Sequence, residues 1–429
     1  MKVARYSWSI AMALFLAIPT ALWANGTKED ATQGPVKIVY WRSLTGVAGD
    51  AQEELVKRFN AAQDKVIVES QFQGAYADLI QKLLAGLAAG TVPDVVLLDS
   101  PFVVLFAKDG ALAPLDALVS KDKSGFKLAD YIPGLLQDGY YDGKLYAVPF
   151  MRSTPLLYYN ADMFREAGLP DRAPKTWDEF REFSRKLTLV TAGETTRFGS
   201  AFTLSTSTAH WYFQGAVYAY GGLVSDDKFG IHLSEAPAIK AATLWQDMVF
   251  KDKTAIGSTD PHTEFLNKRV GMVFGSTGSM GNLFSRATFK VNAAFLPGQV
   301  KNLVPVGGAV LAMTSTDKVR QAATWEFLKY MTNADSVSYI VQTTGYMPVS
   351  TSSMNHPDTV AYFTKYPERK VALDQLKFTR PQASVISLGK GTEILRQMVE
   401  KLLVGGMDPA KVMAETTVDL TKEYNDTFK

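Results

Sequence analysis

The first part of the chain alternates short apolar runs with segments in which apolar residues recur at helical spacing. The apolar runs at 36–41, 66–72 and 95–98 predict three buried strands. Between them, residues 49–63 and 76–89 carry apolar side chains every three or four positions and predict two helices. Strand, helix, strand, helix, strand is typical of a parallel sheet covered by helices, so the pattern predicts an α/β fold.

Two later zones interrupt this alternation and predict crossings between two lobes. Residues 139–160 are rich in Tyr, and two extended segments there flank Met151–Pro155. A Gly- and Pro-containing zone, 296–308, precedes a further apolar run at 309–313 and a helical pattern at 318–331. Two crossings separated by a domain's length predict lobes that are each discontinuous in sequence.

The predicted boundaries follow from these crossings. Lobe 1 consists of residues 36–148 with about 305–345, and lobe 2 of about 149–304 with about 346–429. Lobe 2 is predicted to be mainly helical from Lys175 onward. Thr176 is placed to cap the first of these helices, and Glu179 three residues later completes a capping box.

The N-terminus has the pattern of a secretory signal peptide. Lys2 and Arg5 precede an apolar run at 8–24 that contains one proline, and a polar leader at 25–35 follows. We expect cleavage near Ala24, which gives residues 1–24 as the signal peptide and an exported chain. An uncleaved membrane anchor is the alternative, although the run is short for a spanning helix.

Charge and composition exclude several classes of function. The 429 residues contain 45 Lys and Arg against 43 Asp and Glu, and this balance predicts no nucleic-acid partner. The chain has no Cys, which excludes disulfides, thiol catalysis, thiolate metal sites and lipid attachment through an N-terminal Cys.

Catalytic and cofactor motifs are absent from the sequence. The four His residues are far apart and have no metal-ligand spacing. There is no G-x-S-x-G elbow, no phosphate loop with the G-x-x-x-x-G-K-[ST] pattern and no strand-anchored G-x-G-x-x-G. We therefore expect no catalytic residue, no metal and no cofactor. A secreted glycoside-acting enzyme stays as an alternative that would need a carboxylate pair across a cleft.

Aromatic and hydroxyl residues gather instead where predicted strands and helices end. Aromatic faces stack on the C–H faces of sugars, and hydroxyl and backbone N–H groups bind sugar oxygens. For each aromatic residue, packing in the core is the alternative. The residues at such positions are Trp41, Arg42, Tyr76, Asp99, Ser100, Trp177, Trp211 and Tyr346.

The segment 274–279, Phe-Gly-Ser-Thr-Gly-Ser, lies between a predicted strand and a predicted helix at 280–285. Free N–H groups at the helix start, with the hydroxyls of Ser276 and Ser279, would suit an anion or several ligand hydroxyls. A plain turn of small residues is the alternative.

Several motifs, taken in order, resemble a known family. They are Phe150-x-x-Ser-Thr-Pro-Leu-Leu-Tyr-Tyr-Asn160, Pro174-Lys-Thr-Trp177, Ser276-Thr-Gly-Ser279, Gly307-Gly308 and Thr344-Gly-Tyr-Met-Pro348. The mature chain resembles the extracellular solute-binding proteins of ATP-driven importers, in the sugar-binding group that includes maltose-binding proteins. Within that family it resembles most closely the members that bind glycerol-3-phosphate. The resemblance implies a two-lobed periplasmic-binding-protein fold of type II, with a hinge and a ligand cleft between α/β lobes.

The same resemblance implies the ligand-binding residues. Matched motif by motif, the family's ligand contacts fall on Tyr76, Ser153, Trp177, Ser276, Gly308 and Tyr346. Tyr76 would bind from lobe 1 and Trp177, as a stacking ring, and Ser276 from lobe 2. Ser153, Gly308 and Tyr346 would lie near the crossings.

The sequence departs from the family at two positions. A Glu that binds glycerol hydroxyls aligns with Ser100, next to Asp99, and the family's late Arg has no clear match, with Arg396 and Lys390 as candidates. Arg42 and Arg152 are predicted to face the cleft, where a guanidinium would suit a phosphate or carboxylate. A salt bridge between lobes is the alternative for both.

The resemblance implies a carrier without enzymatic activity. It would capture sn-glycerol-3-phosphate or a related glycerophosphodiester in the periplasm and deliver it, as a monomer, to permease subunits in the inner membrane, whose separate ATPase subunits supply the energy. A binder of neutral sugars or oligosaccharides on the same scaffold is the alternative.

Overall fold

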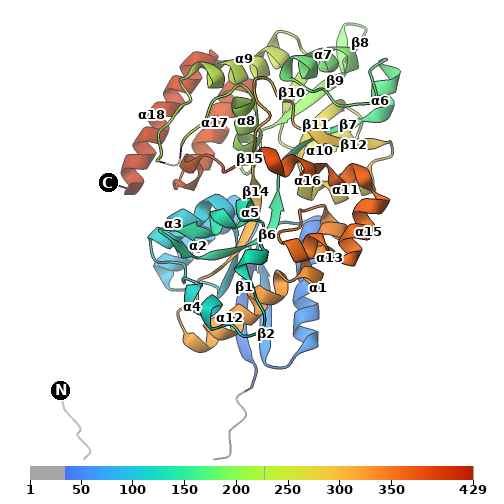
Figure 1. Cartoon of the computed structure of the whole chain (residues 1–429). Helices are drawn as coiled ribbons and strands as arrows, with labels where there is room; N and C mark the ends of the chain where they lie inside the picture. Colours follow the sequence, from blue (N-terminus) through green and yellow to red (C-terminus); the bar gives the residue numbers. More distant parts are fainter. Residues whose placement is uncertain (1–33, 227, 429) are drawn as a thin grey trace, which may run out of the picture. The chain divides into compact units, whose positions relative to one another are not determined.

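The computed structural model describes residues 34–226 and 228–428. The predicted signal peptide, 1–24, and most of the polar leader lie outside the described residues. Within residues 35–429, which form one compact unit, two β-sheets are each flanked by helices (Figure 1).

The first sheet contains the three strands predicted at the start of the chain. In spatial order it consists of β2 (Val66–Phe72), β1 (Val36–Arg42), β3 (Val95–Asp99), β14 (Gly307–Met313) and β6 (Ala147–Ser153). β1 pairs in parallel with β2 and β3, whereas β14 is antiparallel to both β3 and β6. The parallel pairs confirm the predicted βαβ pattern.

The helices at residues 76–89 and 318–331 begin and end where the sequence pattern predicts. The helices between or beside the strands of the first sheet are α1 (Gly46–Ala62), α2 (Tyr76–Ala89), α3 (Val103–Lys108), α4 (Asp116–Lys121), α5 (Pro133–Leu136), α12 (Lys318–Met331) and α13 (Ala334–Thr344). α1 buries Leu55, Val56 and Phe59, the three apolar positions that predict it. The short strands β4 (Tyr140–Tyr141) and β5 (Lys144–Leu145) form a separate hairpin.

The second sheet is built almost entirely from the middle of the chain. Its strands are, in order, β10 (Ala255–Ser258), β9 (Glu194–Thr203), β11 (Val270–Ser276), β7 (Pro155–Asn160) and β12 (Val291–Phe295), and β8 (Leu189–Thr191) pairs with β9. The helices of this part are α6 (Ala161–Glu166), α7 (Trp177–Leu187), α8 (Ala209–Ala219), α9 (Ala236–Phe250), α10 (Pro261–Leu266), α11 (Met280–Arg286), α17 (Gly391–Leu403) and α18 (Pro409–Phe428).

The N-cap predicted for α7 is confirmed, but the capping box is not. The Thr176 hydroxyl accepts a hydrogen bond from the Glu179 N–H at 3.1 Å. The Glu179 carboxylate accepts from the N–H of Lys175, one residue before the cap, and from the Arg172 guanidinium. The reciprocal bond of a capping box is therefore displaced by one residue.

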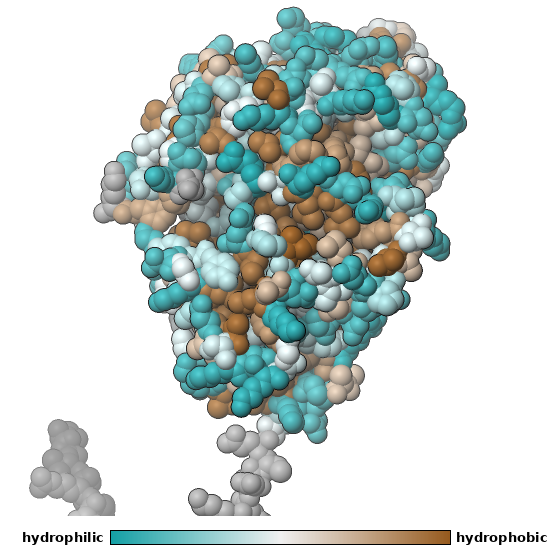
Figure 2. Space-filling view, viewed as in Figure 1, coloured by the Kyte–Doolittle hydropathy of each residue, from teal (hydrophilic) through white to brown (hydrophobic). Residues whose placement is uncertain are grey.

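The chain crosses between the sheets at the predicted places. β6 ends at Ser153 in the first sheet and β7 begins at Pro155 in the second, with Thr154 alone between them. A second crossing runs through β13 (Val304–Pro305), which pairs with β15 (Thr379–Arg380), directly before β14. Hydrophobic residues gather at mid-height of the face in Figure 2, at the level of β15 and the top of β14 in Figure 1.

The segment after residue 346 differs from the predicted lobe boundary. α14 (Thr351–Met354) and α15 (Pro357–Lys365) pack against α13, which itself packs on α1 beside the first sheet. The chain reaches the second sheet again at α16 (Val371–Gln375), which packs on β12. Among the described residues, no helix is long and apolar enough to cross a membrane.

Candidate functional site: a cleft between the two sheets

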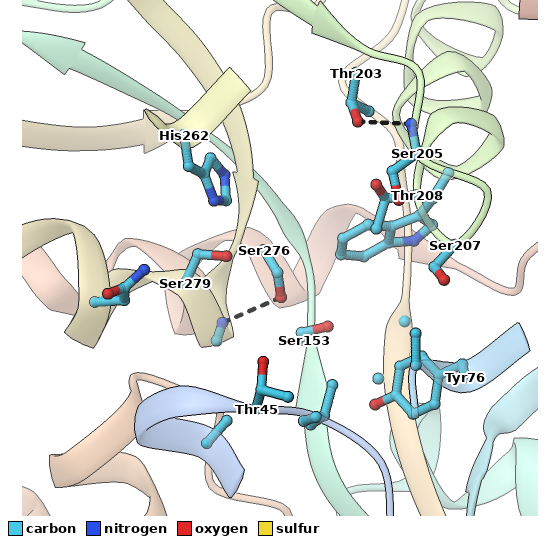
Figure 3. Close-up of a pocket in the computed structure, with 18 of the residues that line it drawn as sticks. Thr45, Tyr76, Ser153, Thr203, Ser205, Ser207, Thr208, His262, Ser276 and Ser279 are labelled. Carbon is cyan, nitrogen blue, oxygen red and sulfur yellow. Dashed lines mark hydrogen bonds between the residues drawn. The ribbon is translucent and has the colours of Figure 1, made fainter. Parts of the chain in front are cut away.

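A cleft of about 590 Å³ lies between segments that follow the strands of the two sheets. In Figure 3, Thr45 and Tyr76 lie on one side, Ser205, Thr208, His262 and Ser279 on the other, and Ser153 between them. Its lining is dominated by hydroxyl groups, which are those of Thr45, Tyr76, Ser153, Thr203, Ser205, Ser207, Thr208, Tyr212, Thr259, Ser276, Ser279 and Tyr346. Such a surface can both donate and accept hydrogen bonds to a polyhydroxylated ligand.

Helices begin at this cleft because strands of both sheets end there. Residues 45–48, at the start of α1, line the cleft, as do 74–76 at the start of α2 and Thr208 at the start of α8. The first turn of α1 contains no acidic residue, and the Thr45 side chain caps none of its N–H groups. These N–H groups are therefore available to a ligand acceptor.

Seven of the predicted site residues line the cleft together. They are Tyr76, Asp99, Ser153, Trp211, Ser276, Gly308 and Tyr346. They come from both sheets and from both crossings, so the order of motifs in the sequence corresponds to one place in the fold.

Gly308 is shaped by its close approach to β6. Its φ of 84° lies in the left-handed region, and a Cβ at this position would clash with the Met151 carbonyl oxygen. Gly307 pairs with Ser153, and a Cβ on Gly307 would lie 2.6 Å from the Trp211 ring. The two glycines thus allow β14 to pack closely against β6 and against the Trp211 ring where both line the cleft.

Ser276 and Tyr346 meet at the turn that precedes α11. The Ser276 hydroxyl accepts from the Gly278 N–H at 3.1 Å, which shapes the 3₁₀ turn of residues 277–279. The Tyr346 ring lies directly against Gly278, where any Cβ would overlap it. The small residues at 276–279 therefore leave room for the Tyr346 ring to pack on the backbone, and they also begin a helix.

A buried acid lies beside the two cleft phenols. Burial raises the pKa of Asp99 to about 7, although the Arg152 guanidinium acts in the opposite direction. Burial also raises the pKa of Tyr346 to about 12 and that of Tyr76 well above its ordinary value, and the Asp99 carboxyl adds to both shifts. The Tyr76 hydroxyl is shielded from solvent and makes no hydrogen bond of normal geometry.

Trp177 does not lie in the cleft, so its predicted stacking on a ligand is wrong. The side chain is fully buried, with ring centroids 5.3 Å from Phe180 and 5.5 Å from Phe274. Phe274 lines the cleft, so Trp177 packs one layer behind it. As the first residue of α7, Trp177 lies on the helix face that packs against the second sheet.

Trp41 and Arg42 also lie outside the cleft lining. The Trp41 indole N–H donates to Gln71 at 3.0 Å, on the neighbouring strand β2. Arg42 forms an ion pair with Glu53 of α1 and donates to Ser70 at 3.2 Å. Both side chains stabilise the contact of β1 with its neighbours.

Arg152 and Ser100 are buried around a different carboxylate. Arg152 is fully buried, forms an ion pair with Asp138 and donates to the Gly308 carbonyl at 3.1 Å. The Ser100 hydroxyl donates to the same Asp138 carboxylate at 3.1 Å. The Arg152 guanidinium therefore holds the backbone at Gly308 and is not available as the predicted anion clamp.

Neither candidate for the late Arg reaches the cleft. Arg396 lies on α17 and forms ion pairs with Glu393 and Glu400 at 2.8 Å each, and Lys390 is the N-cap residue of the same helix. α17 packs against α8 and α18, away from the cleft lining.

The sequence analysis missed a second charged part of the cleft, formed by α10 and α11. Asp260, His262 and Arg286 line it together with Asn282. Burial lowers the pKa of His262, whose Nε2 lies 3.2 Å from the Phe274 carbonyl oxygen, so the ring is neutral at pH 7. Arg286 forms no ion pair within 4.0 Å among the described residues, but it interacts electrostatically with Asp260, whose pKa is lowered by hydrogen bonds from Thr263 and further by the Arg286 guanidinium. Thr45 and Thr208 are the N-cap residues of α1 and α8, and a Thr at the start of a predicted helix could have marked them as candidate site residues. No pattern in the sequence distinguishes Arg286 from a surface arginine.

The described residues contain no group of three or more His, Cys, Asp or Glu that could hold a metal ion. The arrangement of hydroxyls, helix starts, one buried acid and one unpaired guanidinium is suited to holding a small polar solute. Fold and cleft thus define a protein that binds a solute between two lobes.

Comparison with known proteins identifies the family. Residues 54–371 match the family of bacterial extracellular solute-binding proteins, and the chain belongs to it. The family and its relatives are substrate-binding proteins of ABC transporters and not enzymes. The fold is the two-lobed α/β fold of maltose-binding-protein-like members, as the predicted fold class states.

Three relatives are informative. The sn-glycerol-3-phosphate-binding periplasmic protein UgpB of Salmonella typhimurium is 26% identical over 411 residues, which cover 89% of this chain and 91% of that protein. UgpB from Mycobacterium tuberculosis, solved in complex with glycerophosphocholine, is 32% identical with a TM-score of 0.85, covering 92% of this chain and 100% of that one. The substrate-binding protein Lmo0181 from Listeria monocytogenes, solved with cycloalternan, shares the fold at 21% identity and a TM-score of 0.80, covering 91% and 99%.

Proposed function

We propose that this protein captures sn-glycerol-3-phosphate or a related glycerophosphodiester in the periplasm and delivers it to the permease of an ABC importer. In this proposal the chain is exported through a cleaved signal peptide and acts as a monomer. The observation that carries the proposal is the convergence of Tyr76, Ser153, Ser276, Gly308 and Tyr346 on one hydroxyl-lined cleft.

The shape and charge of the cleft support a ligand with a hydroxylated end and an anionic end. Asp99, Tyr76 and Tyr346 offer a carboxyl acceptor and two phenols at one place. The unpaired Arg286 and the uncapped first turn of α1 offer positive potential at another. A cleft of about 590 Å³ has room for a glycerophosphodiester.

A neutral sugar or oligosaccharide is the second candidate, and one observation favours it. Arg42, Arg152 and Arg396, the arginines predicted as candidate anion ligands, all form ion pairs with carboxylates and do not line the cleft. Hydroxyl groups make up most of the cleft's polar lining, which would suit a sugar as well as a glycerol group.

Thermal unfolding of the mature protein with a panel of ligands tests the proposal. Bound ligand is first removed by partial unfolding and dialysis, and sn-glycerol-3-phosphate, glycerophosphocholine, glycerol, glucose and maltose are then compared. At about 100 times its dissociation constant, a ligand adds about 2.7 kcal/mol to the free energy of unfolding. A shift with the phosphate-containing compounds is the expected result. A shift with a sugar alone would replace the proposal by the second candidate.

A further inference from the structure

Asp99 is a cleft residue whose ionisation the family resemblance does not address. It ends β3 and is 8% exposed, and with Asp260 it is one of the two carboxyl groups that line the cleft. Asp99 forms no ion pair within 4.0 Å among the described residues, because the neighbouring Arg152 is engaged by Asp138 and by the Gly308 carbonyl.

The groups that face Asp99 leave its charge only partly compensated. Tyr76 at the start of α2 and Tyr346 after α13 lie close enough for the Asp99 carboxyl to add to the burial that raises the pKa of both phenols. Arg152 on β6 favours its ionised form, Asp138 opposes it, and the backbone N–H of Ser100 donates to it. Its partner on β14, Ala309, carries no charge.

Hydrogen bonds from ligand hydroxyls can stabilise the negative charge of ionised Asp99, which the protein compensates only in part. A carboxylate accepts hydrogen bonds and cannot donate, whereas the Ser and Thr hydroxyls of the lining can do either. Hydrogen bonds from a hydroxyl to a carboxylate are about twice as strong as bonds between neutral groups. Donors that bind to the ionised form stabilise it relative to the protonated acid.

We propose that the cleft binds its ligand with Asp99 ionised, so that binding releases a proton and affinity rises with pH across neutrality. The inference rests on the proposed function only in requiring that a small hydroxylated solute occupies the cleft. It holds for a glycerophosphodiester and for a sugar.

The size of the effect follows from proton linkage. In the unliganded protein Asp99 titrates with a pKa of about 7 because of burial. If only the ionised form binds, affinity increases about tenfold between about pH 6 and about pH 8.5, and near pH 7 about half a proton is released per ligand. Hydrogen bonds from Thr263 lower the pKa of Asp260, so that carboxyl stays ionised over this range. Burial lowers the pKa of His262, so any change of its charge falls at the acid end of the range, and the Asp99→Asn variant separates its effect from that of Asp99.

Calorimetric titration with glycerophosphocholine and with maltose, whose charges do not change over this range, tests the inference. Each is titrated at several pH values in two buffers that differ in ionisation enthalpy, which gives affinity and the number of protons released by the unaltered chain. Asp99→Asn should bind more weakly and without pH dependence. Asp260→Asn, in the same cleft, is the matched control and should keep the tenfold slope.

Each outcome bears on a different claim. If neither compound binds at any pH, the cleft takes neither a glycerophosphodiester nor a sugar, so the proposed function fails and the inference, which requires a hydroxylated solute in the cleft, fails with it. If one binds with an affinity that is flat or falls as pH rises, or with proton uptake, Asp99 is not ionised in the complex and the inference is wrong. Because proton release is measured on the unaltered chain, a poorly folded Asp99→Asn variant would not prevent this decision.

Discussion

Among single residues, the arginines near the cleft differ in whether a carboxylate neutralises them. Arg42 is paired with Glu53 and Arg152 with Asp138, whereas Arg286 lines the cleft without an ion-pair partner among the described residues. A paired guanidinium would lose its carboxylate in order to bind a ligand anion, and that exchange gains little. Arg286 is therefore the arginine of the cleft that can bind a phosphate without first breaking an ion pair, although the nearby Asp260 carboxylate offsets part of its charge.

Replacing Arg286 by Ala should discriminate between the ligand classes. A phosphate-containing ligand should lose about 1.5 kcal/mol of binding free energy, roughly tenfold in affinity, and a neutral sugar much less. Calorimetric titration of both ligands measures the difference. Arg165→Ala, at an exposed position outside the cleft, is the control and should change neither affinity. Equal losses for the two ligands would contradict a role for Arg286 in anion binding.

The two tryptophans, Trp177 and Trp211, should differ in their effect on ligand binding when truncated. Trp177 is fully buried in the aromatic core, so Trp177→Ala should cost about 3–5 kcal/mol of the free energy of unfolding. Trp211 lines the cleft but is only 5% exposed, so Trp211→Ala should weaken ligand binding in addition to lowering stability, whereas Trp177→Ala should lower stability alone. Urea unfolding and calorimetric titration of both variants separate the effects. A Trp177→Ala protein of unchanged stability but weakened affinity would restore the stacking role predicted from sequence.

Asp99 should also make the stability of the unliganded protein depend on pH. Its folded pKa of about 7 lies above the unfolded value, so the folded state binds more protons between the two values and stability falls as pH rises toward 7. The difference is at most about 4 kcal/mol. Asp99→Asn should remove this loss and be more stable than the unaltered chain at about pH 8, with little gain at about pH 4. Urea unfolding at both pH values measures the difference in free energy of unfolding between the variant and the unaltered chain. An equal difference at the two pH values would exclude Asp99 as the source of the pH dependence of stability.

Among the secondary-structure elements, the turn between β11 and α11 positions Tyr346. Gly278 lies against the Tyr346 ring, and its backbone φ is not positive, so a side chain there would collide without straining the backbone. Gly278→Ala should therefore displace Tyr346 and weaken ligand binding about tenfold, with a loss of stability of about 1–3 kcal/mol. Gly134→Ala, where a Cβ meets nothing within 4 Å, is the control. Unchanged affinity would mean that ligand binding does not depend on the packing of Tyr346 against Gly278.

The sequence predicts elements better than it predicts which side of an element faces the cleft. Strands and helices up to residue 99, and the crossings at 151–155 and 296–308, agree with the structure because apolar periodicity and Gly and Pro positions act locally. The predicted positions of Trp177 and Arg152 are wrong because their burial depends on tertiary partners that local periodicity does not reveal, Phe274 for Trp177 and Asp138 for Arg152. Motif order locates a residue near the site, but it does not tell a lining residue from one in the layer behind it.

On the scale of the whole molecule, the residues that line the cleft belong to two lobes joined by crossing strands. A ligand that contacts both lobes stabilises whichever arrangement brings its contacts together, so binding should change the distance between the lobes. The lining of one cleft by Tyr76 from the first part and Ser276 from the second makes this a direct expectation.

The absence of Cys allows a direct measurement of that change. Introduced cysteines at the exposed Val319, on α12 beside the first sheet, and Val190, on β8 of the second, can carry a pair of labels without background. Saturating ligand should shift the distance distribution between the labels toward shorter values. A pair at Val190 and Val404, both beside the second sheet, should not respond. An unresponsive Val319–Val190 pair would mean that the ligand binds without relative motion of the lobes.

The crossing at Thr154, where a single residue separates β6 of one sheet from β7 of the other, has a kinetic consequence. Groups close to a rotation axis move least when two bodies turn about it, so Ser153 and Gly308, next to the crossings, are in place before the lobes close. Under the proposed function we expect them to determine how readily an arriving solute is first held, and therefore the association rate. Thr45 and Ser279 lie on opposite sides of the opening and meet the solute together only when it is enclosed. Contacts from these two residues would have to break before the solute leaves, so we expect them to set its residence time.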